Sequence, residues 1–518
     1  MKIYQVLLFT LLFFQTAIGQ KPSEKWGQLF ELDKDESFVK VIESDENNHF
    51  LQTLYIKVVK FGIVNPDNPT PETPGLIKLD KDFKVLKKNS FKELTDKKKF
   101  VGIELLGDNF ALITEKNNRE GKVREYYVAL INKDLEIVKG NTLVWSIPKE
   151  RSSTDVTYSF SPDNSKMIFN CSYSGLKKDE NQKFRFAILD TDLKTTFQKE
   201  ITFKQMSDKQ SVLQSLVTNS GNVWLMTTVS NGKDEKDKTQ REFDLFAYLY
   251  TSAGTTKEIK IPISADKSPL SVYADLDESD DIYIFAQYTT LEYNGITGYI
   301  VSKIDGESNE ILFTQANNFD LKLIERANDI NYDKTHSKDP GLSAYHRFAF
   351  LRFNDDNSIY LVMEKYYIEG KAIQNSQYRT FNAQNLVAMS IDENGKQKWA
   401  NLIPKVQFYN SMTTYLNFFA KSNSDKLFIF YNETEKNIDN NLSITQAPKK
   451  FNDLKEFYQM MVEINSSGTM KKSVFLNPEK TPYAYIVKEY VSIGPKEFLM
   501  IGKGYKGNSL VVGMGTFD

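Results

Sequence analysis

SPDNSKMIFNCSY, at residues 161–173, shows the pattern that decides the fold of this chain. A polar turn is followed by an apolar run of strand length, and Asp, Asn and Ser suit such turns because their side chains cap nearby backbone groups. Seven more segments repeat the pattern: DENNHFLQTLYI (45–56), GDNFALITE (107–115), NSGNVWLMTTV (219–229), ESDDIYIFAQY (278–288), NDDNSIYLVMEKY (354–366), SNSDKLFIFYNE (422–433) and GPKEFLMIGKG (494–504). The chain is therefore built from repeats.

Each copy is flanked by further segments typical of strands. A companion strand and a tight turn follow it, as in FRFAILDTDLKTTF (184–197), and another apolar stretch precedes the polar turn, as in FAFLRF (348–353). Four strands, which we name a, b, c and d, thus recur in each unit. Equivalent b positions are 60, 57, 56, 59, 77, 68 and 71 residues apart. This organisation predicts an all-β fold, a single β-propeller of eight blades with four antiparallel strands each.

The two ends of the chain predict how the ring closes. The last unit ends after its c strand at Asp518, and WGQLFEL (26–32) is a spare strand ahead of the first unit. We expect this strand to pair with residues 509–514 as the missing d strand, which leaves no open sheet edge. Seven blades with an extra hairpin is the alternative. The predicted blades span about 35–90, 98–147, 153–203, 211–263, 270–316, 345–404, 415–476 and 482–518 plus 26–32, within one domain over 20–518.

Two fragments resemble known propeller repeats. SIDENGKQKW (390–399) resembles the tryptophan-docking repeat of quinoprotein-type propellers, with Asp392, Gly395 and Trp399 at the expected places. SPDNSKMIF (161–169) resembles the turn and strand of TolB-like and WD40-like blades. Each resemblance covers about ten residues of one blade. The resemblance implies the propeller fold, and we predict no cofactor from it.

The first 19 residues have the features of a signal peptide. Lys2 is followed by the apolar run VLLFTLLFF (6–14) and by Ala17-Ile18-Gly19, a cleavage site ahead of Gln20. The apolar run is shorter than the roughly 20 residues of a membrane-spanning helix. The leader and the Lys-, Asn-, Phe- and Tyr-rich composition resemble exported proteins of Gram-negative bacteria. We therefore expect a periplasmic or extracellular protein.

Composition and motifs argue against several classes of function. The 66 basic and 68 acidic residues leave a net charge of −2, which does not favour nucleic acid or anionic lipid. The chain has three His and one Cys, and no HExxH, CxxC or GxSxG motif. We therefore predict no metal site and no catalytic activity. A propeller enzyme with carboxylates from several blades stays open, as does recognition of a glycan or small ligand at the channel mouth, because convergence in space is invisible in sequence.

The long insertions predict which face of the propeller binds a partner. The b–c and d–a links emerge on one face, and the insertions fall there: residues 62–75, 174–183, 230–242, 366–384 and 433–457 between b and c, and 317–345, with the helix-like run 320–329, between d and a. Insertions gathered on one face of a repeat protein usually mark its binding face. The candidate aromatic contacts are Tyr345, His346, Tyr366, Tyr367, Tyr378 and Phe381, and the candidate polar contacts are Arg326, Arg347 and Arg379.

These observations favour a non-catalytic role. We expect a protein-binding or scaffolding subunit of an exported bacterial cell-envelope assembly, which caps or gates an outer-membrane complex. Its expected partner is a protein, without nucleic-acid binding and without direct insertion into the membrane.

Overall fold

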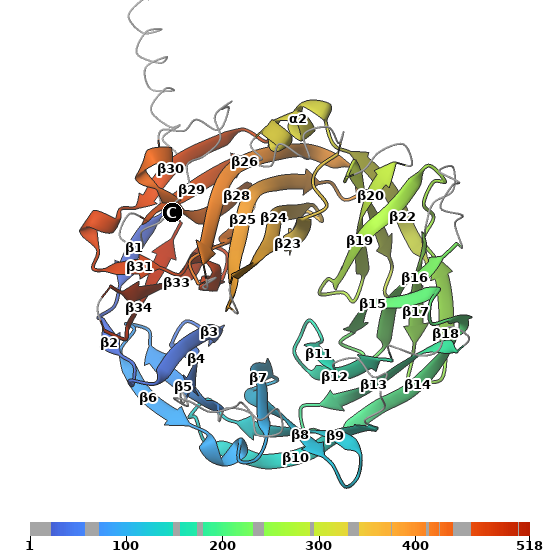
Figure 1. The fold of residues 1–518 in the computed structure, drawn as a ribbon, viewed down its shortest axis with the longest axis horizontal. Helices are drawn as coiled ribbons and strands as arrows, with labels where there is room; N and C mark the ends of the chain where they lie inside the picture. The colour runs from blue at the N-terminus through green and yellow to red at the C-terminus, as the bar shows by residue number, and fades with distance from the viewer. Residues whose placement is uncertain are drawn as a thin grey trace, which may run out of the picture.

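The computed structural model describes residues 22–56, 72–148, 156–173, 180–231, 243–290, 295–329, 341–373, 376–410, 414–423, 425–438, 457–505 and 507–517. These residues form eight β-sheets arranged as blades around a central axis (Figure 1). The prediction of an eight-bladed all-β propeller is therefore confirmed, and the alternative with seven blades is not.

Blades one to seven are four-stranded antiparallel sheets whose strands follow chain order from the axis outward (Figure 1). Strands a are β3 (Glu36–Ser44), β7 (Lys99–Leu106), β11 (Thr157–Phe160), β15 (Gln210–Val217), β19 (Lys267–Leu276), β23 (His346–Phe353) and β27 (Phe418–Asn423). Strands b are β4 (Asn48–Ile56), β8 (Asn109–Asn118), β12 (Lys166–Ser172), β16 (Val223–Ser230), β20 (Ile282–Thr290), β24 (Ile359–Ile373) and β28 (Lys426–Thr434). Strands c are β5 (Glu72–Asp80), β9 (Val123–Ile131), β13 (Asn181–Asp190), β17 (Phe243–Tyr250), β21 (Gly298–Ile304), β25 (Ser376–Ile391) and β29 (Phe457–Asn465). Strands d are β6 (Val85–Ser90), β10 (Ile137–Pro148), β14 (Thr195–Met206), β18 (Thr256–Lys260), β22 (Ile311–Asn318), β26 (Gln397–Asn410) and β30 (Met470–Leu476).

The eighth blade joins the two ends of the chain. Its strands are β31 (Tyr483–Tyr485), β32 (Val491–Ser492), β33 (Glu497–Gly504), β34 (Ser509–Thr516), β1 (Ser23–Trp26) and β2 (Phe30–Glu31). β1 and β2 pair antiparallel with β34, with Trp26 opposite Gly513 and Phe30 opposite Leu510. The predicted closure by an N-terminal strand is confirmed, although that strand begins at Ser23 and is interrupted between Trp26 and Phe30.

The c–d turns follow one local design. In the first blade, the Asp80 carboxylate accepts hydrogen bonds from the backbone N–H groups of Asp82 and Lys84, both at 2.9 Å. Asn132, Asp190, Asp392 and Asn465 accept the same pair of bonds in their own turns. Because these side chains satisfy backbone donors within the turn, short turns of Asp or Asn connect the strands without a longer loop.

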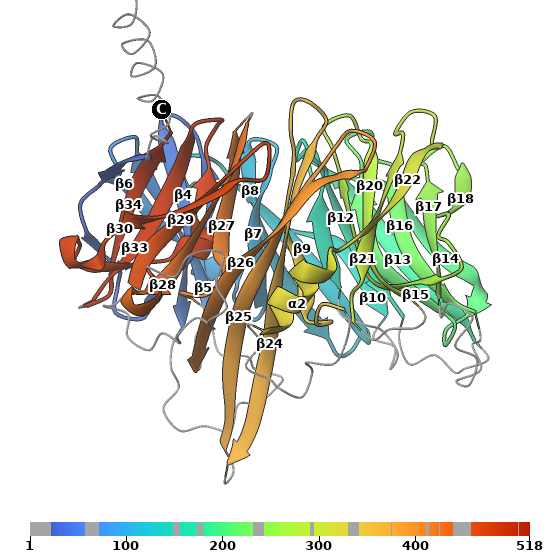
Figure 2. The same ribbon diagram turned by 90° about the horizontal axis from the view of Figure 1, so that it is seen from above.

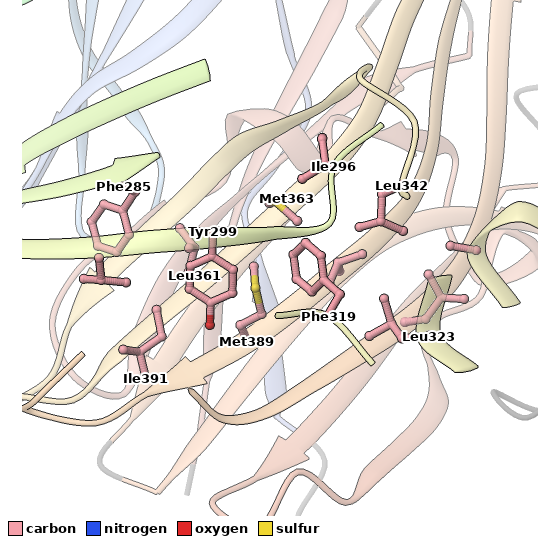
Figure 3. Packing of buried hydrophobic residues seen from close by; sticks show 14 of the residues in the cluster. Phe285, Ile296, Tyr299, Phe319, Leu323, Leu342, Leu361, Met363, Met389 and Ile391 are labelled. Atoms are coloured by element: carbon pink, nitrogen blue, oxygen red, sulfur yellow. The ribbon is translucent and has the colours of Figure 1, made fainter. Parts of the chain in front are cut away.

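The hydrophobic core lies between neighbouring blades. Figure 3 shows Phe285 and Tyr299 of blade five packed with Leu361, Met389 and Ile391 of blade six, all of them buried. Comparable clusters separate the other blades. Successive side chains of a strand point to opposite faces of its blade, and each face packs against a neighbouring blade. Both faces of a blade are therefore apolar, and contacts between sheets hold the ring together.

The d–a link of blade five contains the helix α2 (Leu321–Asp329), as the helix-like run at 320–329 predicts. Leu323, Ile324 and Ala327 are buried in the same cluster as the blade five–six core. Short 3-10 turns lie at Lys92–Leu94, Glu435–Asn437, Pro478–Lys480 and Val487–Glu489. Among the described residues, no helix has the length and apolar character needed to cross a membrane.

One predicted loop is a strand pair instead. We expected residues 366–384 to be a b–c loop, but β24 continues to Ile373 and β25 begins at Ser376, giving a hairpin of strands 15 and 16 residues long. The physical reason is the composition of this segment, because Tyr, Ile, Thr and Phe favour extended backbone. In the same way Glu72–Gly75 of the expected loop at 62–75 belongs to β5.

Candidate functional site

The β24–β25 hairpin defines one face of the ring. Figure 2 shows both strands extending past the other blades on the side opposite the C-terminal end of the chain. Strands b end and strands c begin on this side, which we call the hairpin face. The predicted insertions leave from strand ends that reach this face, such as Ile56, Ser230 and Thr434. The insertions at 62–71, 174–179, 232–242, 330–340 and 439–456 lie outside the described residues.

The projecting part of the hairpin has an exposed strand edge. β23 pairs with β24 as far as His346 opposite Lys365, and the backbone N–H of Tyr366 donates to the carbonyl of Tyr345 at 3.1 Å. Beyond this point, from Ile368 to Ile373, β24 pairs with β25 alone in the part of the chain that the structure describes. A strand edge of this kind can pair with a strand of another chain.

Two aromatic contacts form the base of this edge. The guanidinium carbon of Arg347 lies 3.9 Å from the ring centroid of Tyr366, a cation–π distance. Burial raises the pKa of the Tyr366 hydroxyl, and the nearby Arg347 charge opposes this shift. The rings of Tyr345 and Tyr367 are stacked with centroids 5.2 Å apart. The sequence-predicted residues Tyr345, Arg347, Tyr366 and Tyr367 are therefore brought together.

His346 does not belong to this exposed group, which corrects our expectation that it is a contact residue. Its side chain is only 1% exposed, and Nδ1 lies 3.0 Å from the carbonyl oxygen of Ser343. The His346 carbonyl accepts a hydrogen bond of 2.9 Å from Nε2 of Gln287. The alternation of β23 explains the difference, because Tyr345 and Arg347 point outward while His346 points into the blade interface.

The other predicted residues lie in different settings. Phe381 is half-buried, opposite Ile368, and packs with Tyr409 against a cluster that includes Tyr415. Arg379 is exposed on β25. Tyr378 lies opposite Lys371 in the hairpin, but its side chain is outside the described residues. Arg326 is on α2, next to the outermost strand β26, so the width of blade six separates it from Tyr345 and Arg347 on the innermost strand.

A buried polar network anchors the hairpin, and sequence reasoning missed it. The Nζ of Lys405 on β26 lies 2.6 Å from Oε1 of Glu364 on β24, and both side chains are inaccessible to solvent. Burial lowers the pKa of Lys405, against the attraction of Glu364. Lys405 also donates to Gln407 at 3.0 Å, and Gln407 donates to the carbonyl of Asn432 at 2.7 Å in blade seven.

The network joins two strands of the hairpin's own blade, β24 and β26 of blade six, and links them to β28 of blade seven. Removing one partner of such a buried ion pair leaves an uncompensated charge, which costs about 3–5 kcal/mol. The available signal in the sequence was a charged residue next to an apolar run in each strand, Glu364 after Ile359–Met363 and Lys405 after Leu402-Ile403-Pro404. Because these residues are far apart in the chain, their pairing could not be inferred from spacing.

The described residues of the hairpin face combine aromatic, cationic and backbone polar groups. This face offers stacked rings, a cation–π pair and backbone hydrogen-bonding groups. Within the described ranges, no group of three or more His, Cys, Asp or Glu side chains is placed to hold a metal ion.

Comparisons with known proteins give similarity of fold only. No protein-family model matches the chain, and no curated protein matches it. Among solved structures, the β-propeller domain of the Trilobed protease from Pyrococcus furiosus is 9% identical, with a TM-score of 0.34, covering 86% of this chain and 97% of that one. Cobalt-substituted Synechocystis ACO is 9% identical with a TM-score of 0.33, covering 95% and 93%. The Pyrococcus horikoshii acylaminoacyl peptidase is 9% identical with a TM-score of 0.34, covering 93% of this chain and 60% of that one. At these values the activities of those enzymes carry no argument about this chain.

Proposed function

We propose that this chain is a non-catalytic protein-binding or scaffolding subunit of an exported bacterial cell-envelope assembly, and that its partner docks on the hairpin face. The observation that carries the proposal is the β24–β25 hairpin, which projects beyond the ring and is anchored at its base by the Glu364–Lys405 pair (Figure 2). The role in that assembly is to cap or gate an outer-membrane complex. The sequence of residues 1–19, which has the pattern of a signal peptide, supports the periplasm or the cell exterior as its location.

The side chains at the hairpin base suit a protein partner. Tyr345, one ring of the stacked pair, is 56% exposed, and Ile368, which follows the other ring Tyr367 in the chain, is 51% exposed. Tyr and Arg are enriched among the residues that contribute most to protein–protein affinity. A strand whose backbone is already paired within a hairpin loses less conformational entropy on binding than a free segment, which favours affinity. The proposed mode is strand addition at the β24 edge, with the aromatic residues fixing the register of the partner.

Shortening the hairpin tests this proposal. Residues 369–380 are replaced by Asn-Gly, a turn that can join the paired residues Ile368 and Phe381. Because the base and the buried network are kept, we expect unchanged folding by circular dichroism and thermal unfolding. The wild type and the shortened protein are each expressed at native level and isolated from cell membranes, and the proteins that accompany them are identified by mass spectrometry. We expect the partners of the wild type to be missing from the shortened protein.

The matched control is Leu312→Ala on β22, an exposed aliphatic residue of the outermost strand of blade five. This variant should recover every partner of the wild type. If the folded, shortened protein also recovers all of them, the hairpin is not the docking element.

A further inference from the structure

A cavity of about 760 Å³ lies between blades three and four. Its walls come from β11, β12 and β13 on one side and from β15 on the other. Thr157 is the first residue of β11, Ser172 is the last residue of β12 and Phe184 lies near the start of β13, so the cavity is at the end of the blades that belongs to the hairpin face. Its volume is within the range of roughly 300–1,000 Å³ typical of sites for small molecules.

The cavity lies where the apolar core between these two blades ends. Ile168, Phe186 and Ile188 of blade three belong to the core cluster shared with blade four. The next residue on the same face of β12 is Asn170, which is paired with Thr157 of β11. A close-packed core would have larger apolar side chains at the positions of Asn170 and Thr157. Because these residues are smaller and polar, they leave an unfilled space lined with hydrogen-bonding groups.

The second wall has an irregular strand. A register shift between Val212 and Gln214 places a β-bulge at Leu213, whose side chain is 44% exposed. Gln214 is held in place from the other side, because its side chain exchanges hydrogen bonds of 2.7 and 2.9 Å with the backbone of Ala274 in blade five. Bulges are common next to binding sites, where they redirect a side chain.

The polar groups of the cavity are neutral. Eleven residues line it, and none of them carries a charge. The Thr157 hydroxyl donates to Oδ1 of Asn170 at 2.8 Å, which orients the amide so that its Nδ2 donor faces away from Thr157. The Ser159 hydroxyl is buried without a hydrogen-bond partner among the described residues. A buried hydroxyl in this state costs free energy unless a ligand or water pairs with it.

We infer that this cavity binds a neutral, hydroxyl-rich ligand of the size of a mono- or disaccharide. Ser159 and Asn170 supply its hydrogen bonds, and Leu213 and Phe184 contact its C–H surface. Hydroxyl and amide groups match the hydroxyls of such a ligand, whereas a charged ligand would lose its hydration without gaining a counter-charge. This site is separate from the hairpin, which lies on blade six, and does not depend on the function proposed for it.

The test measures binding of maltose, cellobiose, glucuronate and glucosamine to the full chain by saturation-transfer NMR and calorimetry. We expect at least one neutral disaccharide to bind, and the two charged sugars to bind at least tenfold more weakly. Asn170→Leu, which replaces the amide with a somewhat larger apolar group of the same branching, should weaken binding of that disaccharide at least tenfold. Leu213→Ala, at a position where the side chain is 44% exposed, should weaken it severalfold.

Thr114→Val is a control for the loss of a buried polar group elsewhere in the ring, because the Thr114 hydroxyl of β8 is buried without a partner among the described residues and lies in blade two. It should leave the affinity unchanged. The inference is overturned if neither neutral disaccharide binds, if the charged sugars bind equally well, or if Leu213→Ala binds as tightly as the wild type. If Asn170→Leu does not fold, Leu213→Ala decides alone.

Discussion

His346, at the start of β23, is a buried imidazole whose burial has a consequence for stability. Its pKa is lowered to about 4, mainly by burial; the bond to the Ser343 carbonyl opposes this shift, and the nearby Lys365 charge adds to it. An unfolded chain holds this group near its usual pKa of about 6.5. Between these two values the unfolded state binds more protons, so the free energy of unfolding falls as the pH falls.

We predict that His346→Gln reduces the loss of stability in mild acid. With this difference in pKa, His346 lowers the free energy of unfolding of the wild type by about 2 kcal/mol between pH 7 and pH 5. The variant lacks this contribution. Urea unfolding of both proteins at the two pH values measures the difference. Glu433 has the opposite effect, because burial raises its pKa to about 6, but it is present in both proteins and cancels in the comparison. Equal losses in the two proteins would contradict the burial of a neutral imidazole.

The turns show how far single residues could be predicted. Asp or Asn at the first position of the c–d turns indicated tight turns, and these are present. The left-handed position was not predictable, because Phe83, Leu135 and Leu193 occupy it in the first three blades at φ of 64°, 57° and 61°. Gly is the residue that adopts the left-handed conformation most easily, and other residues pay a conformational cost of roughly 1–2 kcal/mol. All three side chains are buried. Burying each of them stabilises the fold by about 2 kcal/mol, which offsets the conformational cost.

At the scale of the element, the N-terminal strand holds the ring closed. The Trp26 ring lies directly over Gly513, where a Cβ atom would be 2.6 Å from the indole. It also packs on Tyr483 with centroids 4.8 Å apart. Gly513 is therefore required by the close approach of the closing strand. Without β1 and β2, the backbone of β34 would present an open edge.

Deleting residues 22–32 should destabilise the whole propeller. We expect a clearly lower melting temperature, still as one transition, because the blades share their cores with their neighbours. Differential scanning calorimetry of the deletion variant measures this. Leu29→Ala, at an exposed position between β1 and β2, is the control and should melt with the wild type. An unchanged melting temperature in the deletion variant would mean that β1 and β2 contribute nothing to closure.

Strand number was easier to predict than strand length. The closing strand followed from counting, since the last unit lacks a d strand. The sequence predicts a loop where the β24–β25 hairpin lies, because the strands of this hairpin are two to three times longer than the usual 5–6 residues. The described side chains of its projecting part, from Ile368 to Gly370 and at Arg379, are exposed, so the alternation of buried and exposed residues that reveals other strands is missing at these positions.

For the whole molecule, the face of the ring that carries the insertions could be predicted from the order of the strands. Which residues come together on that face could not. Strand order alone places the b–c links on one face, and the hairpin lies there (Figure 2). Which residues meet on that face depends on alternation and on contacts between blades. Arg326 is separated from Arg347 for that reason, and the Glu364–Lys405 pair, 41 residues apart, became visible only in three dimensions.

The hairpin face is proposed to bind a protein partner. Site-specific photo-cross-linking in cells tests this most directly, with a photoreactive residue at Ile368 in one variant and at Leu312 in another. These positions are comparably exposed, at 51% and 54%, but Leu312 is on the outermost strand of blade five. We predict a discrete cross-linked adduct to an envelope protein from position 368 and none from position 312. No adduct from position 368, or the same adduct from both positions, would contradict the claim.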